Sequence, residues 1–253
     1  RRMSSVPVAS LTDLKTCCTV IIGSWVGSVM KAAAMKGRVL ERRHFNALLA
    51  ASLALGSSPA VWAQAKKEAV VLIVGDSLSA EYGLRRGSGW AALLQERLTK
   101  EKVPARVVNA SVSGDTTSGG RSRLPALLKQ HQPAVVVIEL GGNDALRGLP
   151  LNMTRDNLSA MARAAREAGA KVLLVGMEMP PNYGAKYAQE FRDVFSGVAK
   201  AEKTGLVPFF LKGVADGPEP LKLFQSDLIH PNESAHPLML ATVWPELRKL
   251  LPR

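Results

Sequence analysis

The sequence has very few cysteines and no long apolar run. Its only two cysteines, Cys17 and Cys18, are adjacent, so neither a disulfide framework nor a cysteine-based metal site can be built from them. No uninterrupted run of about 18 apolar residues is present, and an ordinary membrane-spanning helix is therefore not expected. The 253 residues are 47% hydrophobic and 21% charged, which indicates a globular protein and excludes a disordered or collagen-like chain.

The N-terminal quarter has the layout of a secretory signal peptide. Basic residues follow Met35, and a short apolar run over residues 47–55 comes next. Gly56 and Pro59 break that run, and the small residue Ala63 precedes a polar segment. This order predicts cleavage after Ala63 and hence a periplasmic or secreted protein. We divide the chain into an upstream leader or overextended reading frame (1–34), a signal peptide (35–63) and one folded domain (64–253).

The export route and the attachment to membranes depend on the same segment. Arg42 and Arg43 resemble a twin-arginine signal, but Glu41 stands where Ser or Thr is usual, so both export routes stay open. No cysteine follows the apolar run, and we expect no lipid anchor and no stable membrane attachment.

Much of the positive charge lies in the leader. The whole chain has a formal net charge of +12, but residues 1–63 hold 8 of the 33 Lys+Arg and 2 of the 21 Asp+Glu, which leaves +6 for residues 64–253. The remaining basic residues are dispersed and form no block of the kind that binds nucleic acid. We therefore expect a small-molecule partner and no nucleic acid.

From residue 69 onward, apolar runs alternate with amphipathic stretches. The runs predict strands at 69–74, 106–109, 134–140, 171–176 and 205–208. The amphipathic stretches predict helices at 90–100, 122–132, 154–168, 185–203 and 238–251, the last with a kink at Pro245. This alternation favours one parallel sheet with helices on both faces, in which ligands bind beyond the carboxyl ends of the strands.

Short polar motifs stand where these strands end. Gly-Asp-Ser-Leu at 75–78 follows the first, Ser-Gly-Asp-Thr-Thr at 113–117 the second, and Gly-Gly-Asn-Asp at 141–144 the third. Asp-Leu-Ile-His-Pro at 227–231 lies near the C-terminus. Each motif alone is also typical of an ordinary turn or helix cap. Together, at one edge of a sheet, they indicate a catalytic site.

The residue types suit nucleophilic catalysis. A serine hydroxyl is a poor nucleophile until a base takes its proton, and His230 is the candidate base for Ser77. Asp227 is the candidate that orients the imidazole. The backbone N–H groups of Ser77 and Gly114 and the side-chain amide of Asn143 are candidate donors to a tetrahedral oxyanion.

The four motifs resemble those of the SGNH, or GDSL, hydrolase superfamily. Further segments, at 108–116, 123–133, 139–144 and 181–184, are similar to its bacterial periplasmic branch of thioesterase I, arylesterase and lysophospholipase enzymes. The likeness covers about residues 69–251. No Gly-x-Ser-x-Gly elbow is present, which argues against the α/β-hydrolase fold.

This resemblance implies the fold and the roles in the site. It implies a flavodoxin-like three-layer α/β/α domain with a parallel five-stranded sheet in the order 2-1-3-4-5. It also implies Ser77 as nucleophile, Asp227 and His230 as the rest of the triad, and Gly114 and Asn143 in the oxyanion hole. The implied activity is hydrolysis of acyl esters and thioesters through an acyl-enzyme. We expect a monomer that needs neither cofactor nor metal.

Two loops are candidates for contact with the acyl chain. The segment 145–150, which contains Leu146 and Leu149, resembles the mobile loop of that branch, although an ordinary loop before the next helix is an equal alternative. The segment after the fourth strand contributes a second set of candidates: Met179, Pro180 and Tyr183.

Several alternatives remain at this point. Within the same superfamily, a carbohydrate O-acetyl esterase is the second hypothesis, and a flavodoxin-like binding domain without turnover is the third. His230, Glu233 and His236 also suggest a metal site, but Pro231 and Pro237 disrupt the single helical face that their spacing would need. We expect His236 to be solvated or to cap a helix, and we expect Asp76 and Asp144 to fix the catalytic loops by hydrogen bonds.

Overall fold

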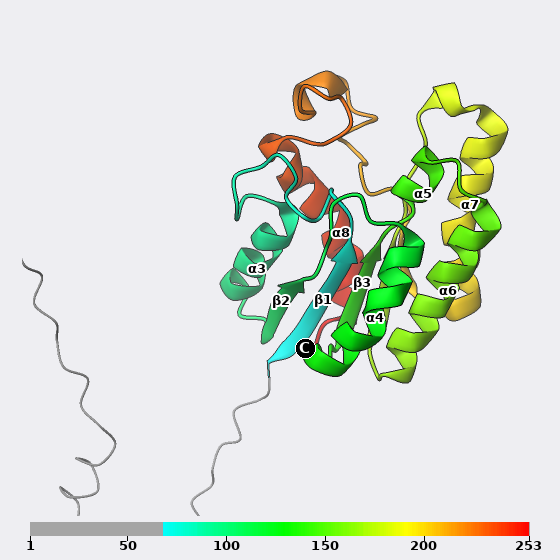
Figure 1. The fold of residues 1–253 in the computed structure, drawn as a ribbon. Helices are drawn as coiled ribbons and strands as arrows, with labels where there is room; N and C mark the ends of the chain where they lie inside the picture. Colours follow the sequence, from blue (N-terminus) through cyan, green and yellow to red (C-terminus); the bar gives the residue numbers. More distant parts are fainter. Residues whose placement is uncertain (1–67, 253) are drawn as a thin grey trace, which may run out of the picture. The chain divides into compact units, whose positions relative to one another are not determined.

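The computed structural model describes residues 68–252 (Figure 1). These residues belong to the second of two units into which the chain divides, Gln64–Arg253. The leader, the signal peptide and the cleavage site predicted for residues 1–63 lie outside the described residues.

Five parallel strands form one sheet in the order β2-β1-β3-β4-β5. The strands are β1 (Ala69–Gly75), β2 (Ala105–Asn109), β3 (Val135–Glu139), β4 (Lys171–Val175) and β5 (Gly205–Val207). In the register, Leu72 of β1 lies opposite Val108 of β2 on one side and Val136 of β3 on the other. The predicted strand order and the predicted parallel direction are confirmed, and the fold is the expected three-layer sandwich.

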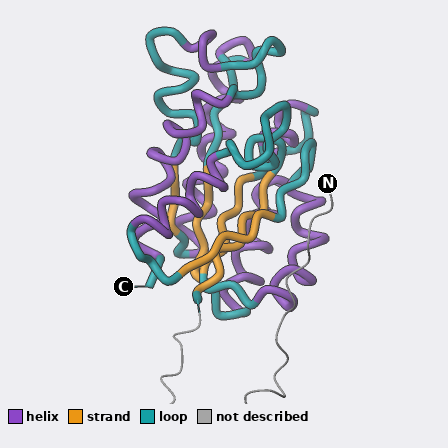
Figure 2. Tube along the Cα trace, turned by 90° about the vertical axis from the view of Figure 1, so that its left-hand side faces the viewer, coloured by secondary structure: helices purple, strands orange, loops and turns teal. Residues whose placement is uncertain are grey.

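Helices cover both faces of the sheet (Figures 1 and 2). One face carries α3 (Trp90–Lys100) and α8 (His236–Leu250), and the other carries α4 (Thr117–His131), α6 (Leu151–Glu167) and α7 (Ala185–Glu202). The short elements are α5 (Gly142–Leu146), η1 (Pro181–Tyr183), η2 (Pro220–Leu223) and η3 (Glu233–Ala235).

The core follows from the alternation of side chains along the strands. Val71 and Ile73 of β1 pack in the cluster with α3 and α8, whereas Leu72 and Val74 pack in the cluster with α4, α6 and α7. Both faces of the strand are therefore buried, which explains why its sequence is a continuous apolar run. On α3, Trp90, Leu94 and Leu98 are fully buried at helical spacing.

Four helices differ from their predictions by two residues or more, or were not predicted, and among them α6 begins at Leu151 instead of residue 154. Helix α4 begins at Thr117 because the Thr116 side chain accepts from the Gly119 N–H at 3.4 Å and caps its first turn. Helix α8 begins at His236, two residues before the predicted start, and includes Pro245 in its interior. The short helix α5 stands where the sequence predicts only a loop. No helix among residues 68–252 combines the length and the apolar character that crossing a bilayer requires.

Candidate active site

The predicted catalytic residues meet where the strands end. Ser77 lies in the turn after β1, in which the Asp76 carbonyl accepts from the N–H groups of Ser79 and Ala80 at 3.2 and 2.9 Å. Gly114 follows β2, Asn143 lies in α5 after β3, and the Asp227–His230 loop follows β5. Because parallel strands share one carboxyl edge, loops far apart in the sequence are brought to one place.

Ser77, His230 and Asp227 form a continuous hydrogen-bonded series. The Nε2 of His230 lies 2.9 Å from the Oγ of Ser77, and its Nδ1 lies 2.7 Å from the Oδ2 of Asp227. The structure therefore brings together the three residues that the sequence predicts, in the order that a nucleophile, its base and an orienting carboxylate would require.

A tight turn holds the aspartate and the histidine side by side. The Asp227 Oδ1 accepts from the backbone N–H groups of Ile229 and His230, both at 3.0 Å. Leu228 adopts a left-handed φ of 58°, and the N–H of Gln225 donates to the His230 carbonyl at 2.8 Å. These bonds close the loop and keep the Asp227 carboxylate next to Nδ1 of the His230 imidazole.

The same bonds keep Asp227 ionised. The backbone N–H of His230, its imidazole and the N–H of Ile229 lower the pKa of Asp227 from 3.8 to about 2. The carboxylate therefore retains its charge at every pH at which the protein is expected to work, and it holds the proton of the imidazole on Nδ1.

The candidate oxyanion donors come from two further loops. Gly114 has a φ of +76°, and a Cβ added there would meet only the Nη2 of Arg147, at 3.6 Å. The backbone conformation, more than lack of space, therefore requires glycine at this position. Arg147 donates from Nη2 to the Gly114 carbonyl at 2.7 Å, which joins the loop after β2 to the end of α5.

Asp76 fixes the third candidate donor. Its Oδ2 accepts from the Nδ2 of Asn143 at 3.0 Å, and its Oδ1 accepts from the N–H of Leu78 at 3.0 Å. An amide nitrogen carries two hydrogens, so Asn143 keeps a second N–H for an oxyanion. Burial raises the pKa of Asp76 to about 6, and the bonds from Leu78 and Asn143 oppose that rise.

A second buried carboxylate supports the turn of Ser77. The Oε2 of Glu139 accepts from the Oγ of Ser79 at 2.7 Å, and that Oγ accepts from the Nε1 of Trp90 at 3.1 Å. Burial, and then the neighbouring charge of Asp76, raise the pKa of Glu139 well above its usual range. A Cβ at Gly75 would lie 2.7 Å from this Oε2, which explains the glycine of the Gly-Asp-Ser block.

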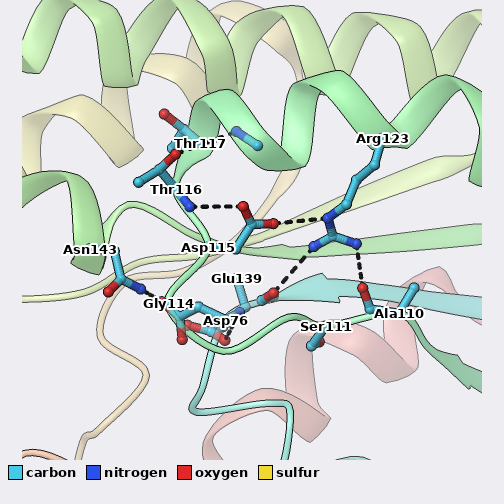
Figure 3. A network of polar contacts seen from close by, with 12 residues as sticks. Asp76, Ala110, Ser111, Gly114, Asp115, Thr116, Thr117, Arg123, Glu139 and Asn143 are labelled. Carbon is cyan, nitrogen blue, oxygen red and sulfur yellow. Dashed lines mark hydrogen bonds and ion pairs between the residues drawn. The ribbon is translucent and has the colours of Figure 1, made fainter.

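Arg123 of α4 joins the loops that follow β1 and β2 (Figure 3). Its Nε donates to the Oδ2 of Asp115 at 2.8 Å, its Nη1 donates to the Ala110 carbonyl, and its Nη2 donates to the Gly75 carbonyl at 3.3 Å. One guanidinium therefore joins the ends of β1 and β2 to the loop of Gly114.

The predicted roles of Asp76 and Asp144 as loop-fixing residues are confirmed. Asp144 is fully buried, and its Oδ2 accepts from the N–H of Thr117 at 2.9 Å. This bond ties α5, which carries Asn143, to the first turn of α4, and Asp76 ties Asn143 to the turn of Ser77.

Comparison with known proteins agrees with this geometry. Residues 73–238 match the GDSL-like Lipase/Acylhydrolase family. The chain belongs to this family. As a member of it, the protein is an ester hydrolase, which confirms the resemblance predicted from the motifs.

Relatives in the GDSL family extend over nearly the whole described domain. Over 181 residues, the chain is 54% identical to the Esterase TesA of Pseudomonas aeruginosa, covering 72% of this chain and 89% of that protein. Over the same length it is 41% identical to the Thioesterase 1/protease 1/lysophospholipase L1 of Escherichia coli K12, covering 72% of this chain and 84% of that protein. It is also 41% identical to the Arylesterase of Vibrio mimicus, with coverage of 72% and 89%.

Solved structures of GDSL-family enzymes share the fold. The crystal structure of TesA has a TM-score of 0.69 at 54% identity and covers 72% of this chain and 99% of that one. The psychrotrophic esterase EstA from Pseudoalteromonas sp., inhibited by monoethylphosphonate, has a TM-score of 0.67 at 38% identity and covers 71% and 97%.

The predicted acyl-contact residues of this GDSL enzyme lie in different surroundings. Leu146 is 48% exposed at the end of α5, and Leu149 is half-buried. Pro180 and Tyr183 are exposed beyond β4, whereas Met179 is buried in the core cluster with α7. Their contact with substrate stays a prediction.

The prediction for His236 is wrong in one respect. The side chain is 2% exposed, so it is not solvated. Its Nδ1 accepts from the Trp90 N–H at 3.0 Å, which makes it the partner of the first turn of α3, as the capping alternative predicts. Burial lowers the pKa of His236 and favours the neutral ring that this acceptor role needs. Among residues 68–252, no three His, Cys, Asp or Glu side chains are grouped to hold a metal.

Two residues of the site are missed by the sequence. The ring of Tyr82 lies against that of His230, with centroids 4.4 Å apart, and Gln225 bonds to the loops on both sides of that contact. Tyr82 closely follows the Gly-Asp-Ser-Leu block, which is the only signal that could have found it. Gln225 stands outside the recognised motifs, and no signal in the sequence points to it.

Proposed function

We propose that the protein hydrolyses acyl esters and thioesters through an acyl-enzyme on Ser77. The observation that carries the proposal is the continuous series from the Ser77 Oγ through the imidazole of His230 to the Asp227 carboxylate, at 2.9 and 2.7 Å. A serine joined to a neutral imidazole has a base in place for its proton, and a carboxylate on the other ring nitrogen stabilises the imidazolium that forms.

The residues support a two-step reaction. In acylation, the Ser77 Oγ attacks the carbonyl carbon while Nε2 of His230 takes the hydroxyl proton. The negative charge on the carbonyl oxygen is received by the N–H groups of Ser77 and Gly114 and by Nδ2 of Asn143. The tetrahedral species then collapses, and the bond to the alcohol or thiol breaks as His230 returns the proton to that leaving group.

Deacylation repeats these steps with water. His230 takes a proton from a water molecule that attacks the acyl-serine carbonyl, and the second oxyanion forms in the same place. Its collapse releases the carboxylic acid and returns the proton to the Ser77 Oγ. Asp227 keeps its negative charge throughout the reaction, because its pKa of about 2 lies far below neutral pH.

The substrate is a small acyl ester or thioester. The names of the relatives include esterase, arylesterase and thioesterase/lysophospholipase, and this range favours broad acceptance of leaving groups. Exposed apolar side chains such as Leu146 and Tyr183 suit contact with an acyl chain. We also propose that the enzyme acts as a monomer in the periplasm or outside the cell after cleavage near Ala63, without a membrane anchor.

The test compares the wild type with Ser77→Ala on p-nitrophenyl esters from acetyl to palmitoyl. We expect turnover by the wild type and its loss by a factor of at least about 10³ in the variant. A single optimum at acetyl, with activity on acetylated sugars, would instead favour the carbohydrate esterase. Equal turnover by both proteins would show that Ser77 is not the nucleophile. Sequencing the N-terminus of exported protein should give Gln64 as the first residue.

A further inference from the structure

An exposed aromatic ring packs against the candidate base. The ring centroids of Tyr82 and His230 are 4.4 Å apart with an interplanar angle of 40°. Tyr82 is 50% exposed, so this contact does not come from burial in the core. Its backbone N–H donates to the Ser77 carbonyl at 3.4 Å, which ties the ring to the turn that carries the nucleophile.

One amide group connects the tyrosine to the loop of the histidine. The Nε2 of Gln225 donates to the Tyr82 carbonyl at 2.9 Å and to the Pro231 carbonyl at 3.0 Å. Its backbone N–H donates to the His230 carbonyl at 2.8 Å. Gln225 therefore bonds to residues on both sides of the Ser77–His230 contact.

The local sequence leaves room for this amide. Gly83 has a φ of +71°, and a Cβ added there would overlap the Gln225 side chain. A larger residue at this position would both strain the backbone and displace the amide from the Tyr82 carbonyl. Gly83 is therefore explained by the Gln225 amide, which connects the loop of Tyr82 to that of His230.

The contact matters because the base must stay aligned. The groups described around the imidazole are Ser77 on Nε2, Asp227 on Nδ1 and the Tyr82 ring against the plane of the ring. The two hydrogen bonds fix the edges of the imidazole, and the tyrosine limits its tilt. Small misplacements of a catalytic group can cost about 10²-fold in rate.

We propose that Tyr82 is a positioning residue for His230. Its ring, anchored through Gln225, holds the imidazole so that Nε2 faces the Ser77 hydroxyl in acylation and the attacking water in deacylation. The inference rests on the proposed function, because it assigns a role at the same site. The ring and not the phenol hydroxyl carries the effect, since the contact is between the two ring systems.

The experiment measures kcat and KM for p-nitrophenyl butyrate with Tyr82→Phe and Tyr82→Leu. We expect Tyr82→Phe to stay within about 2-fold of the wild type, and Tyr82→Leu to lose about 10-fold in kcat with little change in KM. The rate of inactivation by a fluorophosphonate, which needs an activated serine but no turnover, should fall by the same factor. Leu238→Ala, which removes another exposed apolar side chain, is the matched control and should keep wild-type kinetics.

A third variant tests the anchor. Gln225→Met keeps the length of the side chain but removes both of its donated bonds, and we expect a loss of kcat in the same direction as Tyr82→Leu. If the two residues act together, the double variant Tyr82→Leu/Gln225→Met should lose little more than the worse single variant. Thermal unfolding of each variant checks that the fold is kept.

Specific results would overturn the inference. Wild-type kcat in a folded Tyr82→Leu would show that the ring does not position the base. A rise in KM alone would make Tyr82 a substrate contact, and an equal loss in Tyr82→Phe would assign the effect to the hydroxyl. If the losses of the two single variants added fully in free energy in the double variant, Gln225 would not act through Tyr82. Each of these leaves the proposed function intact, whereas a wild type that neither turns over esters nor reacts with the phosphonate would overturn both.

Discussion

The Nδ2 of Asn143 donates to the buried Oδ2 of Asp76 at 3.0 Å, so the residue before the candidate nucleophile orients a candidate oxyanion donor. The two residues come from the ends of β1 and β3, which are neighbours in the sheet. The contact therefore couples the position of the serine turn to that of the Asn143 amide.

The first prediction concerns this pair. Asn143→Ala should lower kcat by about 10²- to 10³-fold, because it removes one oxyanion donor. Asp76→Ala should lower kcat in the same direction by a smaller factor, because the amide remains but is no longer held. Steady-state kinetics check both. A double variant whose losses multiply would contradict the coupling, since Asp76 is expected to act through Asn143.

The second prediction concerns stability and pH. Burial raises the pKa of Asp76 from 3.8 to about 6, so between these values the folded protein keeps a proton that the unfolded chain has lost. The contribution of Asp76 to stability is therefore largest below pH 4 and falls as the pH rises towards 6. Asp76→Asn, which cannot ionise, should gain stability relative to the wild type over this range. Chemical denaturation from pH 4 to 7 measures the difference, and a constant difference would contradict the raised pKa.

The third prediction concerns the orienting carboxylate. Asp227→Asn should keep the geometry of the loop but lower kcat by about 10²- to 10⁴-fold, because an amide cannot hold the proton of the imidazole on Nδ1 in the same way. Asp227 lies at the surface of the loop, so the melting temperature should change little. The result that would count against it is near-normal kcat in the folded variant.

The fourth prediction compares two glycines. Gly75→Ala would place a Cβ 2.7 Å from the Glu139 Oε2 and 2.8 Å from the Ser79 Oγ, so the free energy of unfolding should fall by about 1–3 kcal/mol. Gly197 lies exposed inside α7 with no atom near its Cβ position, and Gly197→Ala should instead stabilise by about 0.5–1 kcal/mol. Denaturant unfolding of both variants gives the sign of each change.

The sequence predicts the sheet well and the short polar elements poorly. Buried strands such as β3 are continuous apolar runs, and their positions need no tertiary information. Helix α5 is missed because Gly141 and Gly142 are typical of a loop, whereas the left-handed φ of 117° at Gly141 starts a helix here. Helix α4 is predicted too short because its first turn contains Gly119 and Gly120.

Within the site, recognisable motifs were predictable and tertiary contacts were not. Ser77 and His230 stand in motifs that resemble those of the SGNH family, and this resemblance implied that the two residues meet. The partner of His236 could not be predicted, because the Trp90 N–H lies 146 residues away in the chain. Tyr82 and Gln225 are likewise 143 residues apart, and neither carries a local pattern that indicates the other.

His230, the proposed base, lies near the C-terminal end of the chain, after all five strands. A growing chain that has emerged as far as Val207 already holds all five strands and Ser77, but it has neither Asp227 nor His230. The segment that follows supplies both side chains and then α8, whose Met239, Val243 and Leu247 complete the core on one face of the sheet. A chain that ends at Val207 should therefore not hydrolyse esters, because it lacks the proposed base, the proposed orienting carboxylate and the last helix of the core.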